Sequence, residues 1–248
     1  MSHPAVLAFF EHALKAISPG ALAPLRVVEV GAHDVNGSIR GVVLSSIEVS
    51  EYVGVDLTPG PGVDIVCSGH ELDLPAASFD LTLSAECLEH NPYWMETLRN
   101  MRRLTKPDGF VIVSCATLGR LEHGTARTNP DSSPGTRDLG WNYYRNLTPS
   151  DFPQDFLASF AAHRFWINRY SRDLYFLGCL SGTIPQALDS GGHFVTIKPI
   201  ASLFTKATLE FPLAMLRALL SEKLYQEAGV TLLNVRTRAK NLVGGRIE

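Results

Sequence analysis

The sequence LRVVEVGAHDVNGS, residues 25–38, decides the fold of this 248-residue chain. Its valine-rich first half ends at Glu29 and Val30, and a loop of Gly, Asp and Asn follows directly. Continuous apolar runs are typical of parallel strands that helices cover on both faces, and such sheets bind ligands beyond the carboxyl ends of their strands. The stretch therefore predicts a buried strand that leads into a ligand-binding turn at Gly31.

A second apolar strand, residues 51–56, ends in Asp56, which stands 25 residues after Gly31. A carboxylate near this spacing receives ribose hydroxyls in nucleotide-binding sheets. A dinucleotide loop needs the full pattern G-x-G-x-x-G, whereas this loop has His33 and Val35 between Gly31 and Gly37. The pattern predicts a nucleoside cofactor, and a nicotinamide dehydrogenase is a distant alternative.

Four features then occur in a fixed order: Glu29-Val-Gly31, the acid Asp56, the segment LPAASFDL at 74–81, and the segment LTKPDGF at 104–110. Together they resemble the motifs of class I S-adenosylmethionine (SAM) methyltransferases over about residues 25–116. The resemblance implies SAM as cofactor, with Asp56 on the ribose hydroxyls and Glu29 and Gly31 at the methionine end. It implies cofactor contacts at strand ends and in the loops that follow them, from Glu29, Gly31, Ala32, His33, Gly37, Asp56, Leu57, His70, Glu71, Ala85 and Glu86.

The first loop departs from the family pattern E-x-G-x-G-x-G, because His33 and Val35 occupy the second and third glycine places. Asp34 and Asn36 are residue types that tolerate left-handed backbone. We expect them, with Gly37, to form the turn in place of the missing glycines. The departure also suggests an alternative function, a degenerate SAM-binding module without catalysis.

The alternation of strands and helices predicts an α/β fold, a doubly wound Rossmann-like sheet. We expect seven mostly parallel strands with an antiparallel last strand, and an amphipathic helix over residues 6–17 that packs on the sheet. We also expect a short third strand over residues 63–67 and a helix that begins at Thr148 and runs to about Ala162. The methyltransferase domain should span residues 1–182 and a C-terminal helical extension residues 183–248. Leucines spaced at helical intervals between 213 and 224 predict a helix that packs on its own domain, with a homodimer face as the alternative.

Residues 118–147 have no periodicity and many turn-forming residues, which predicts a lid-like insertion beside the site. The stretch from Trp141 to Pro149, WNYYRNLTP, resembles a segment of methyltransferases associated with polysaccharide and glycan biosynthesis. This resemblance implies a saccharide or other small polar acceptor.

The pentapeptide Glu86-Cys-Leu-Glu89-His90 follows the predicted fourth strand. On a helix, positions i, i+3 and i+4 share one face, so its two carboxylates and its imidazole would converge. These groups suit a divalent cation such as Mg²⁺ or Mn²⁺, with the imidazole also admitting Zn²⁺ or Fe²⁺. The same E-x-x-E-H occurs in similar methyltransferases of quinone biosynthesis and small-RNA 2′-O-methylation. The structural alternative is a cluster that only borders the pocket.

These observations predict a SAM-dependent methyltransferase that transfers the methyl group in line to a hydroxyl of a small polar or glycan-like acceptor. His123 and His90 are the catalytic candidates for proton removal or acceptor orientation, because an unperturbed imidazole titrates near neutrality. Either one could instead be a structural histidine. The alternative mechanism is metal-assisted, with Glu86, Glu89 and His90 holding the cation.

The composition of the chain argues against several other classes of protein. No uncharged apolar run reaches about 18 residues, and no basic apolar leader is present, so we expect a cytoplasmic protein without a membrane span. Four cysteines without C-x-x-C spacing predict reduced thiols. Residues 1–98 hold 3 basic and 13 acidic side chains and residues 99–172 hold 11 and 6. The acidic half suits a sulfonium cofactor, and the few basic residues of the tail do not predict nucleic-acid binding.

Overall fold

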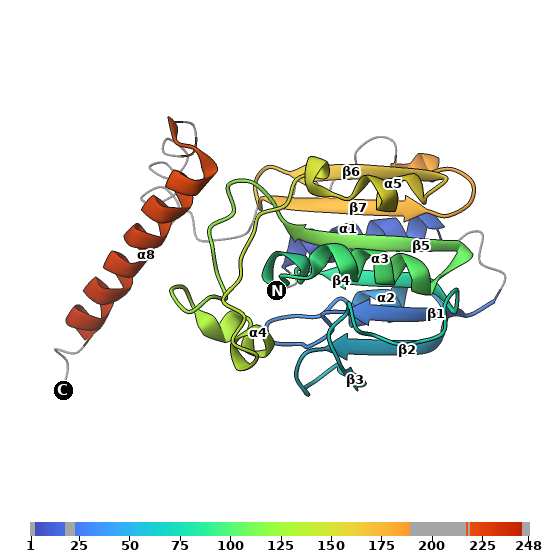
Figure 1. The fold of residues 1–248 in the computed structure, drawn as a ribbon, viewed down its shortest axis with the longest axis horizontal. Helices are drawn as coiled ribbons and strands as arrows, with labels where there is room; N and C mark the ends of the chain where they lie inside the picture. Colours follow the sequence, from blue (N-terminus) through green and yellow to red (C-terminus); the bar gives the residue numbers. More distant parts are fainter. Residues whose placement is uncertain (1–2, 18–22, 189–216, 218, 245–248) are drawn as a thin grey trace.

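A seven-stranded sheet forms the centre of the protein (Figure 1). The computed structural model describes residues 3–17, 23–188, 217 and 219–244. In this part of the chain the strand order is β3-β2-β1-β4-β5-β7-β6, and β7 runs antiparallel to both of its neighbours. The strands are β1 (Leu25–Val30), β2 (Val49–Asp56), β3 (Ile65–Val66), β4 (Phe79–Ala85), β5 (Thr105–Ala116), β6 (Ala162–Asn168) and β7 (Asp173–Cys179). The predicted α/β fold is confirmed.

Helices cover both faces of the sheet. Helices α1 (Pro4–Ile17) and α2 (Arg40–Ser46) pack on one face, and α3 (Trp94–Leu104) and α5 (Gln154–Ala158) lie on the other. Side chains alternate between the two faces along β5, because Ile112 joins the first core cluster while Val111 and Val113 join the second. Phe9 of α1 is fully buried and stacks on Tyr175 of β7 with 4.4 Å between ring centroids. The predicted N-terminal helix therefore packs on the sheet as expected.

The structure corrects two predicted elements. A helix was expected from Thr148 to about Ala162, but the chain forms a 3-10 turn at Pro149–Asp151, the short helix α5, and then β6 from Ala162. Pro153 lies between the two helical pieces and cannot donate a backbone hydrogen bond, which separates them. The third strand was expected over residues 63–67 and contains only two residues.

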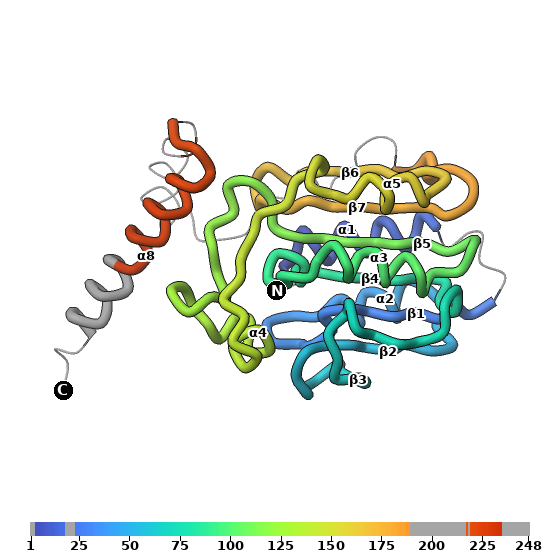
Figure 2. Tube along the Cα trace, in the orientation of Figure 1, coloured from blue at the N-terminus to red at the C-terminus, as the bar shows by residue number. Residues whose placement is uncertain are grey.

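Residues 118–147 leave the end of β5 and cross the edge of the sheet where the parallel strands end (Figure 2). They include a 3-10 turn at Pro130–Ser132 and the helix α4 (Pro134–Asp138). The segment has little regular structure, in agreement with its lack of periodicity. Ligands of doubly wound sheets bind at this edge, so the segment lies where a lid would lie.

The helix α8 (Glu222–Gly244) stands to one side of the sheet, beside residues 118–147 (Figure 1). Leu213 and Leu216 of the leucine stripe predicted between 213 and 224 lie outside the described residues. Of its described members, Leu220 is partly buried, whereas Leu219 and Leu224 are 76% and 56% exposed and do not pack on the domain. Within the described residues, no helix combines the length and apolar character needed to cross a membrane.

Candidate active site

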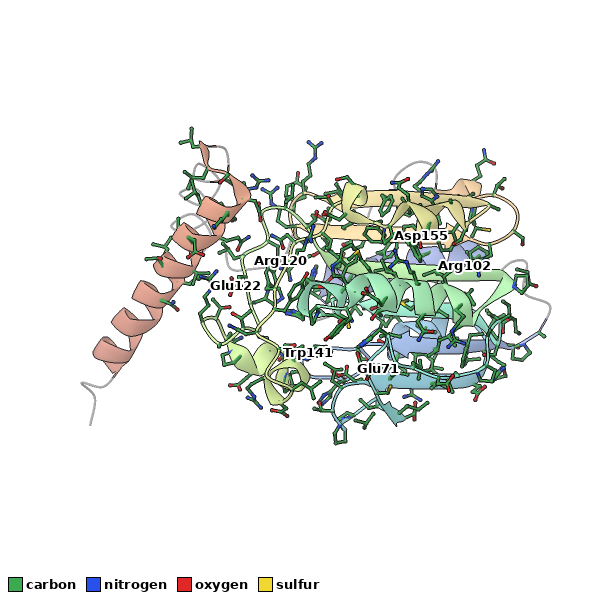
Figure 3. The ribbon with its side chains drawn as sticks, in the orientation of Figure 1. Glu71, Arg102, Arg120, Glu122, Trp141 and Asp155 are labelled. Carbon is green, nitrogen blue, oxygen red and sulfur yellow. The ribbon has the colours of Figure 1, made fainter. Side chains whose placement is uncertain are left out.

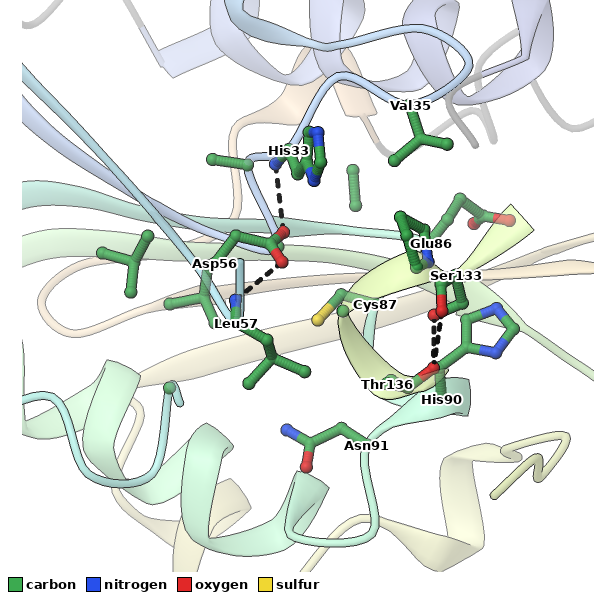
Figure 4. Close-up of a pocket in the computed structure, with 18 of the residues that line it drawn as sticks. His33, Val35, Asp56, Leu57, Glu86, Cys87, His90, Asn91, Ser133 and Thr136 are labelled. Atoms are coloured by element: carbon green, nitrogen blue, oxygen red, sulfur yellow. Dashed lines mark hydrogen bonds between the residues drawn. The ribbon is translucent and has the colours of Figure 1, made fainter. Parts of the chain in front are cut away.

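A cavity opens at the carboxyl ends of β1, β2 and β4 (Figure 4). Its walls come from the loops after these strands and from residues 132–136 and Trp141 of the 118–147 segment. Nine of the predicted cofactor residues line it: Glu29, Gly31, Ala32, His33, Gly37, Asp56, Leu57, Ala85 and Glu86. Residues predicted from three separate parts of the sequence are thus brought to one cavity.

The turn after β1 explains why only one glycine is needed at its start. Gly31 has a φ of +87°, and a Cβ there would lie 2.5 Å from the Cβ of Cys87. The amide of Gly37 donates to Oδ1 of Asp34 at 2.8 Å, so Asp34 helps to close the turn as its residue type predicted. The ring of His33 packs against Gly60 in the loop after β2. A side chain at the second glycine place is therefore accommodated by the neighbouring loop.

Asp56 at the end of β2 is held by backbone amides (Figure 4). Its Oδ2 accepts from the amide of His33 at 3.0 Å, and its Oδ1 accepts from the amide of Leu57 at 2.7 Å. Burial raises the pKa of Asp56, and these hydrogen bonds partly oppose the rise because they stabilise the carboxylate. A carboxylate has about four lone-pair sites, so Asp56 can still receive a hydroxyl donor from a ligand in the cavity.

Glu29 lies at the floor of the cavity and is 2% exposed. The hydroxyl of Tyr52 donates to its carboxylate. Burial raises the pKa of Glu29 to about 7, although Tyr52 and the charge of Arg40 oppose the rise. The charge of this carboxylate therefore depends on the ligand and on pH near neutrality.

The structure does not bring His70 and Glu71 to the cavity. The His70 ring stacks on Tyr93 with centroids 4.2 Å apart, and its Nδ1 lies 2.7 Å from Oγ of Ser68. Ser68 and Gly69, which directly precede His70, line the cavity instead. The predicted polar loop borders the cavity, but Ser68 and Gly69, two and one positions before His70, form the cavity wall there.

The stretch from Glu86 to His90 does not form the helix on which the predicted cation site depended. Glu86 has a φ of +52°, and only Leu88–His90 form a 3-10 turn. Oε1 of Glu86 accepts from Oγ of Ser114 at 3.1 Å, and its Oε2 lies 3.7 Å from Nη2 of Arg120. Glu86 therefore turns away from the other two predicted ligands.

Glu89 and His90 instead form a cluster with His123 of the 118–147 segment. The rings of His90 and His123 meet edge to face at 4.8 Å, and His90 lines the cavity. Burial lowers the pKa of His90 and lowers that of His123 to about 4. Burial and the nearby Glu86 raise the pKa of Glu89 to about 8. Both imidazoles are thus neutral at pH 7.

Arg120 ties the base of the 118–147 segment to the sheet (Figure 3). Its Nη1 contacts Oδ1 of Asp173 on β7 at 2.7 Å, and its Nη2 approaches Glu86. His3 also pairs with Asp173, at 3.0 Å. Arg120 thus bridges the two carboxylates of a second group of potential metal-binding side chains, which consists of His3, Glu86 and Asp173.

Helix α8 contacts the 118–147 segment through polar side chains. The side chain of Gln226 accepts from the amide of Glu122 at 2.8 Å and donates to the carbonyl of Arg120 at 2.6 Å. Arg127 pairs with Glu227 at 3.0 Å. The extension thus holds the part of the segment that carries His123.

Comparison with known proteins gives a match to one family model and to solved structures of similar fold. Residues 37–113 match the family model described as a methyltransferase domain, and no curated protein matches the sequence. A Burkholderia thailandensis 1,6-didemethyltoxoflavin N1-methyltransferase with bound S-adenosylhomocysteine is 19% identical, with a TM-score of 0.45 over 68% of this chain and 77% of that one. A Mesorhizobium loti SAM-dependent methyltransferase is 16% identical, with a TM-score of 0.44 over 67% of this chain and 95% of that one. The family match includes β2, β4 and most of β5.

Proposed function

We propose that this chain is a SAM-dependent methyltransferase that methylates a hydroxyl group of a small polar or glycan-like acceptor, which the match of residues 37–113 to a methyltransferase domain supports. SAM would bind in the cavity at the ends of β1, β2 and β4. The observation that carries the cofactor assignment is Asp56, a carboxylate that backbone amides hold in the wall of the cavity at the end of β2.

The residues around the cavity fit such a ligand. Gly31 lines the cavity, and its missing Cβ lets the turn after β1 pack directly against Cys87 in the loop after β4. Asp56 would accept hydrogen bonds from the two ribose hydroxyls, as in other nucleotide-binding sheets. Glu29 would face the cationic methionine end, where a positive ammonium favours its ionised form.

Bound SAM supplies an electrophilic methyl group and leaves as a neutral thioether. The protein then has to align the acceptor oxygen with the methyl group and receive the hydroxyl proton. His90 on the cavity wall, with His123 behind it, is the group that we propose for orienting the acceptor hydroxyl. Both imidazoles are neutral at pH 7 and therefore have a lone pair available for this role.

Two aromatic side chains support a glycan-like acceptor. Trp141 lines the cavity, and Tyr93 is 43% exposed beside it, with 5.4 Å between their ring centroids. Exposed aromatic faces with polar edges offer apolar surface to the C–H groups of a sugar and hydrogen bonds to its hydroxyls. This agrees with the resemblance of residues 141–149 to glycan-associated methyltransferases.

Isothermal titration with S-adenosylhomocysteine tests the cofactor site. Wild type should bind, and Asp56→Asn should weaken binding by about 1.5 to 3 kcal/mol, because a charged acceptor of the ribose hydroxyls is lost. Asp73→Asn, which changes an exposed acid in the loop after β3, should bind like wild type. Melting curves of all three proteins must show that they are folded, since Asp56 also holds two backbone amides. Equal affinities for wild type and Asp56→Asn would refute the assignment of Asp56.

Methyl transfer to a panel of hydroxyl and amine acceptors, followed with methyl-labelled SAM, tests the reaction. Label on oxygen of a saccharide or small polar alcohol supports the proposal. Label only on nitrogen would refute O-methylation. Tight binding of S-adenosylhomocysteine without turnover on any acceptor would favour the binding module without catalysis.

A further inference from the structure

Two groups of ionisable side chains lie beside the cavity, and they differ in how their charges are satisfied. In the group of His3, Glu86 and Asp173, the guanidinium of Arg120 lies 2.7 Å from Asp173 and 3.7 Å from Glu86, although Oε2 of Glu86 has no hydrogen-bond partner within the described residues. In the group of Glu89, His90 and His123, no arginine or lysine pairs with the carboxylate within the described residues. The second group therefore needs another explanation.

Glu89 is fully buried, and neither of its carboxylate oxygens has a hydrogen-bond partner in the described structure. The Nδ1 atom of His90, whose residue is 6% exposed, also has none. Buried polar groups are nearly always paired, because burial without a partner is costly. Unpartnered acceptors that converge in one place are expected where a cation binds.

The hydrogen bond of His123 fixes which ring nitrogen is available. Its Nδ1 lies 3.1 Å from the carbonyl oxygen of Leu121. A carbonyl only accepts hydrogen bonds, so Nδ1 carries the proton and Nε2 presents a lone pair. Metal-binding histidines typically donate their other N–H to a backbone carbonyl or a carboxylate in this way.

We propose that Glu89, His90 and His123 bind one divalent transition-metal ion at the edge of the cavity. One ligand atom from each residue already lies within 4.8 Å of the others. In a tetrahedral site with bonds of about 2.1 Å, ligand atoms are about 3.4 Å apart, so the side chains close in by about 1 Å when the ion binds. Two imidazoles and one carboxylate suit Zn²⁺, Fe²⁺ or Mn²⁺ better than Mg²⁺ or Ca²⁺. Glu86, which pairs with Arg120, is not a ligand.

The position of the site gives the ion a use in the proposed reaction. His90 both belongs to the cluster and lines the cavity, so the ion borders the space for the acceptor. Three protein ligands leave a coordination position open, and a hydroxyl bound there has a lowered pKa. In the metal-bound protein the ion orients the hydroxyl, because the imidazole lone pairs of His90 and His123 are then its ligands. This role of the ion rests on the proposed function, whereas binding of the ion does not.

Titration with Co²⁺, followed by its visible absorption bands, tests the site in protein that has been freed of metal with a chelator. Wild type should bind one equivalent of Co²⁺, which Zn²⁺ displaces and Mg²⁺ does not. Glu89→Gln keeps the size of the side chain and removes the charge, and His123→Asn removes one imidazole. Each should weaken Co²⁺ binding at least 100-fold. Glu86→Gln is the matched control and should bind Co²⁺ within about twofold of wild type.

Absence of one-equivalent Co²⁺ binding by wild type would overturn the proposal. Equal affinities of wild type, Glu89→Gln and His123→Asn would do the same, and a large loss in Glu86→Gln would show that the ligand set is wrong. Titration of the same samples with S-adenosylhomocysteine separates the two proposals. Binding of S-adenosylhomocysteine without binding of Co²⁺ would refute only the proposed metal site. Binding of Co²⁺ without binding of S-adenosylhomocysteine would refute only the proposed function.

Discussion

Replacing Glu29 with Gln should stabilise the ligand-free protein at neutral pH. Glu29 is buried beneath the cavity, and burial raises its pKa from an ordinary value of 4.5 to about 7. Tyr52 and Arg40 favour the charged form, but they do not outweigh burial. The folded protein therefore holds a proton on Glu29 over a pH range in which the unfolded chain has lost it.

The sign and size of the effect follow from proton linkage. Below about pH 4.5 Glu29 is protonated in both states and contributes no pH dependence. Between about pH 4.5 and 7 the folded state binds the extra proton, so the free energy of unfolding falls as pH rises. Each pKa unit corresponds to 1.36 kcal/mol, which gives a loss of about 3 kcal/mol that is complete above pH 7. Glutamine has no charge and avoids this loss.

Urea denaturation of wild type and Glu29→Gln at pH 5, 6, 7 and 8 measures the effect. The difference between the two free energies of unfolding should grow in favour of the variant by about 3 kcal/mol from the lowest to the highest pH. Taking this difference removes contributions that both proteins share, including that of Glu89. The control Glu51→Gln changes an exposed side chain on β2 and should remain close to wild type throughout. A difference between wild type and Glu29→Gln that stays constant with pH would refute the reasoning.

Two further substitutions test the backbone turn and the buried charge network. Gly31→Ala should cost about 1 to 3 kcal/mol in urea denaturation, because it places a side chain at a φ of +87° and against Cys87, and it should abolish binding of S-adenosylhomocysteine in calorimetry. Unchanged binding would show that the turn does not approach the ligand. Arg120→Met should lower the free energy of unfolding by about 3 to 5 kcal/mol, since Glu86 and Asp173 lose their cation. A loss below about 1 kcal/mol would mean that the network contributes little.

The first loop could be predicted because its cause is local. The valines of β1 require burial, and Val27 and Val28 are fully buried. Asp34 has a side chain that can bond to the backbone of its own turn, and it does so at Gly37. Such properties depend on residues a few positions apart, so the sequence displays them directly.

The grouping of Glu86 with Glu89 and His90 could not be predicted in the same way. Helical spacing would have placed them on one face, but Glu86 ends β4 in a left-handed conformation. Its partners Ser114 and Arg120 come from β5 and from the segment after β5. The sheet register that brings β5 beside β4 decides where this carboxylate points, and no short-range pattern encodes that register.

The 118–147 segment contributes to both the cavity and the cluster of Glu89, His90 and His123. Because the segment has no periodicity, its sequence did not predict which of its side chains would make these contacts. It contributes Trp141 to the cavity and His123 to the cluster with Glu89. Each contact is made by a single side chain, so no face of a regular element repeats in the sequence. Gln226 of α8 bonds to the backbone on both sides of Leu121, two positions before His123. Helix α8, which lies outside the sheet, therefore holds the backbone of the part of the segment that leads to His123.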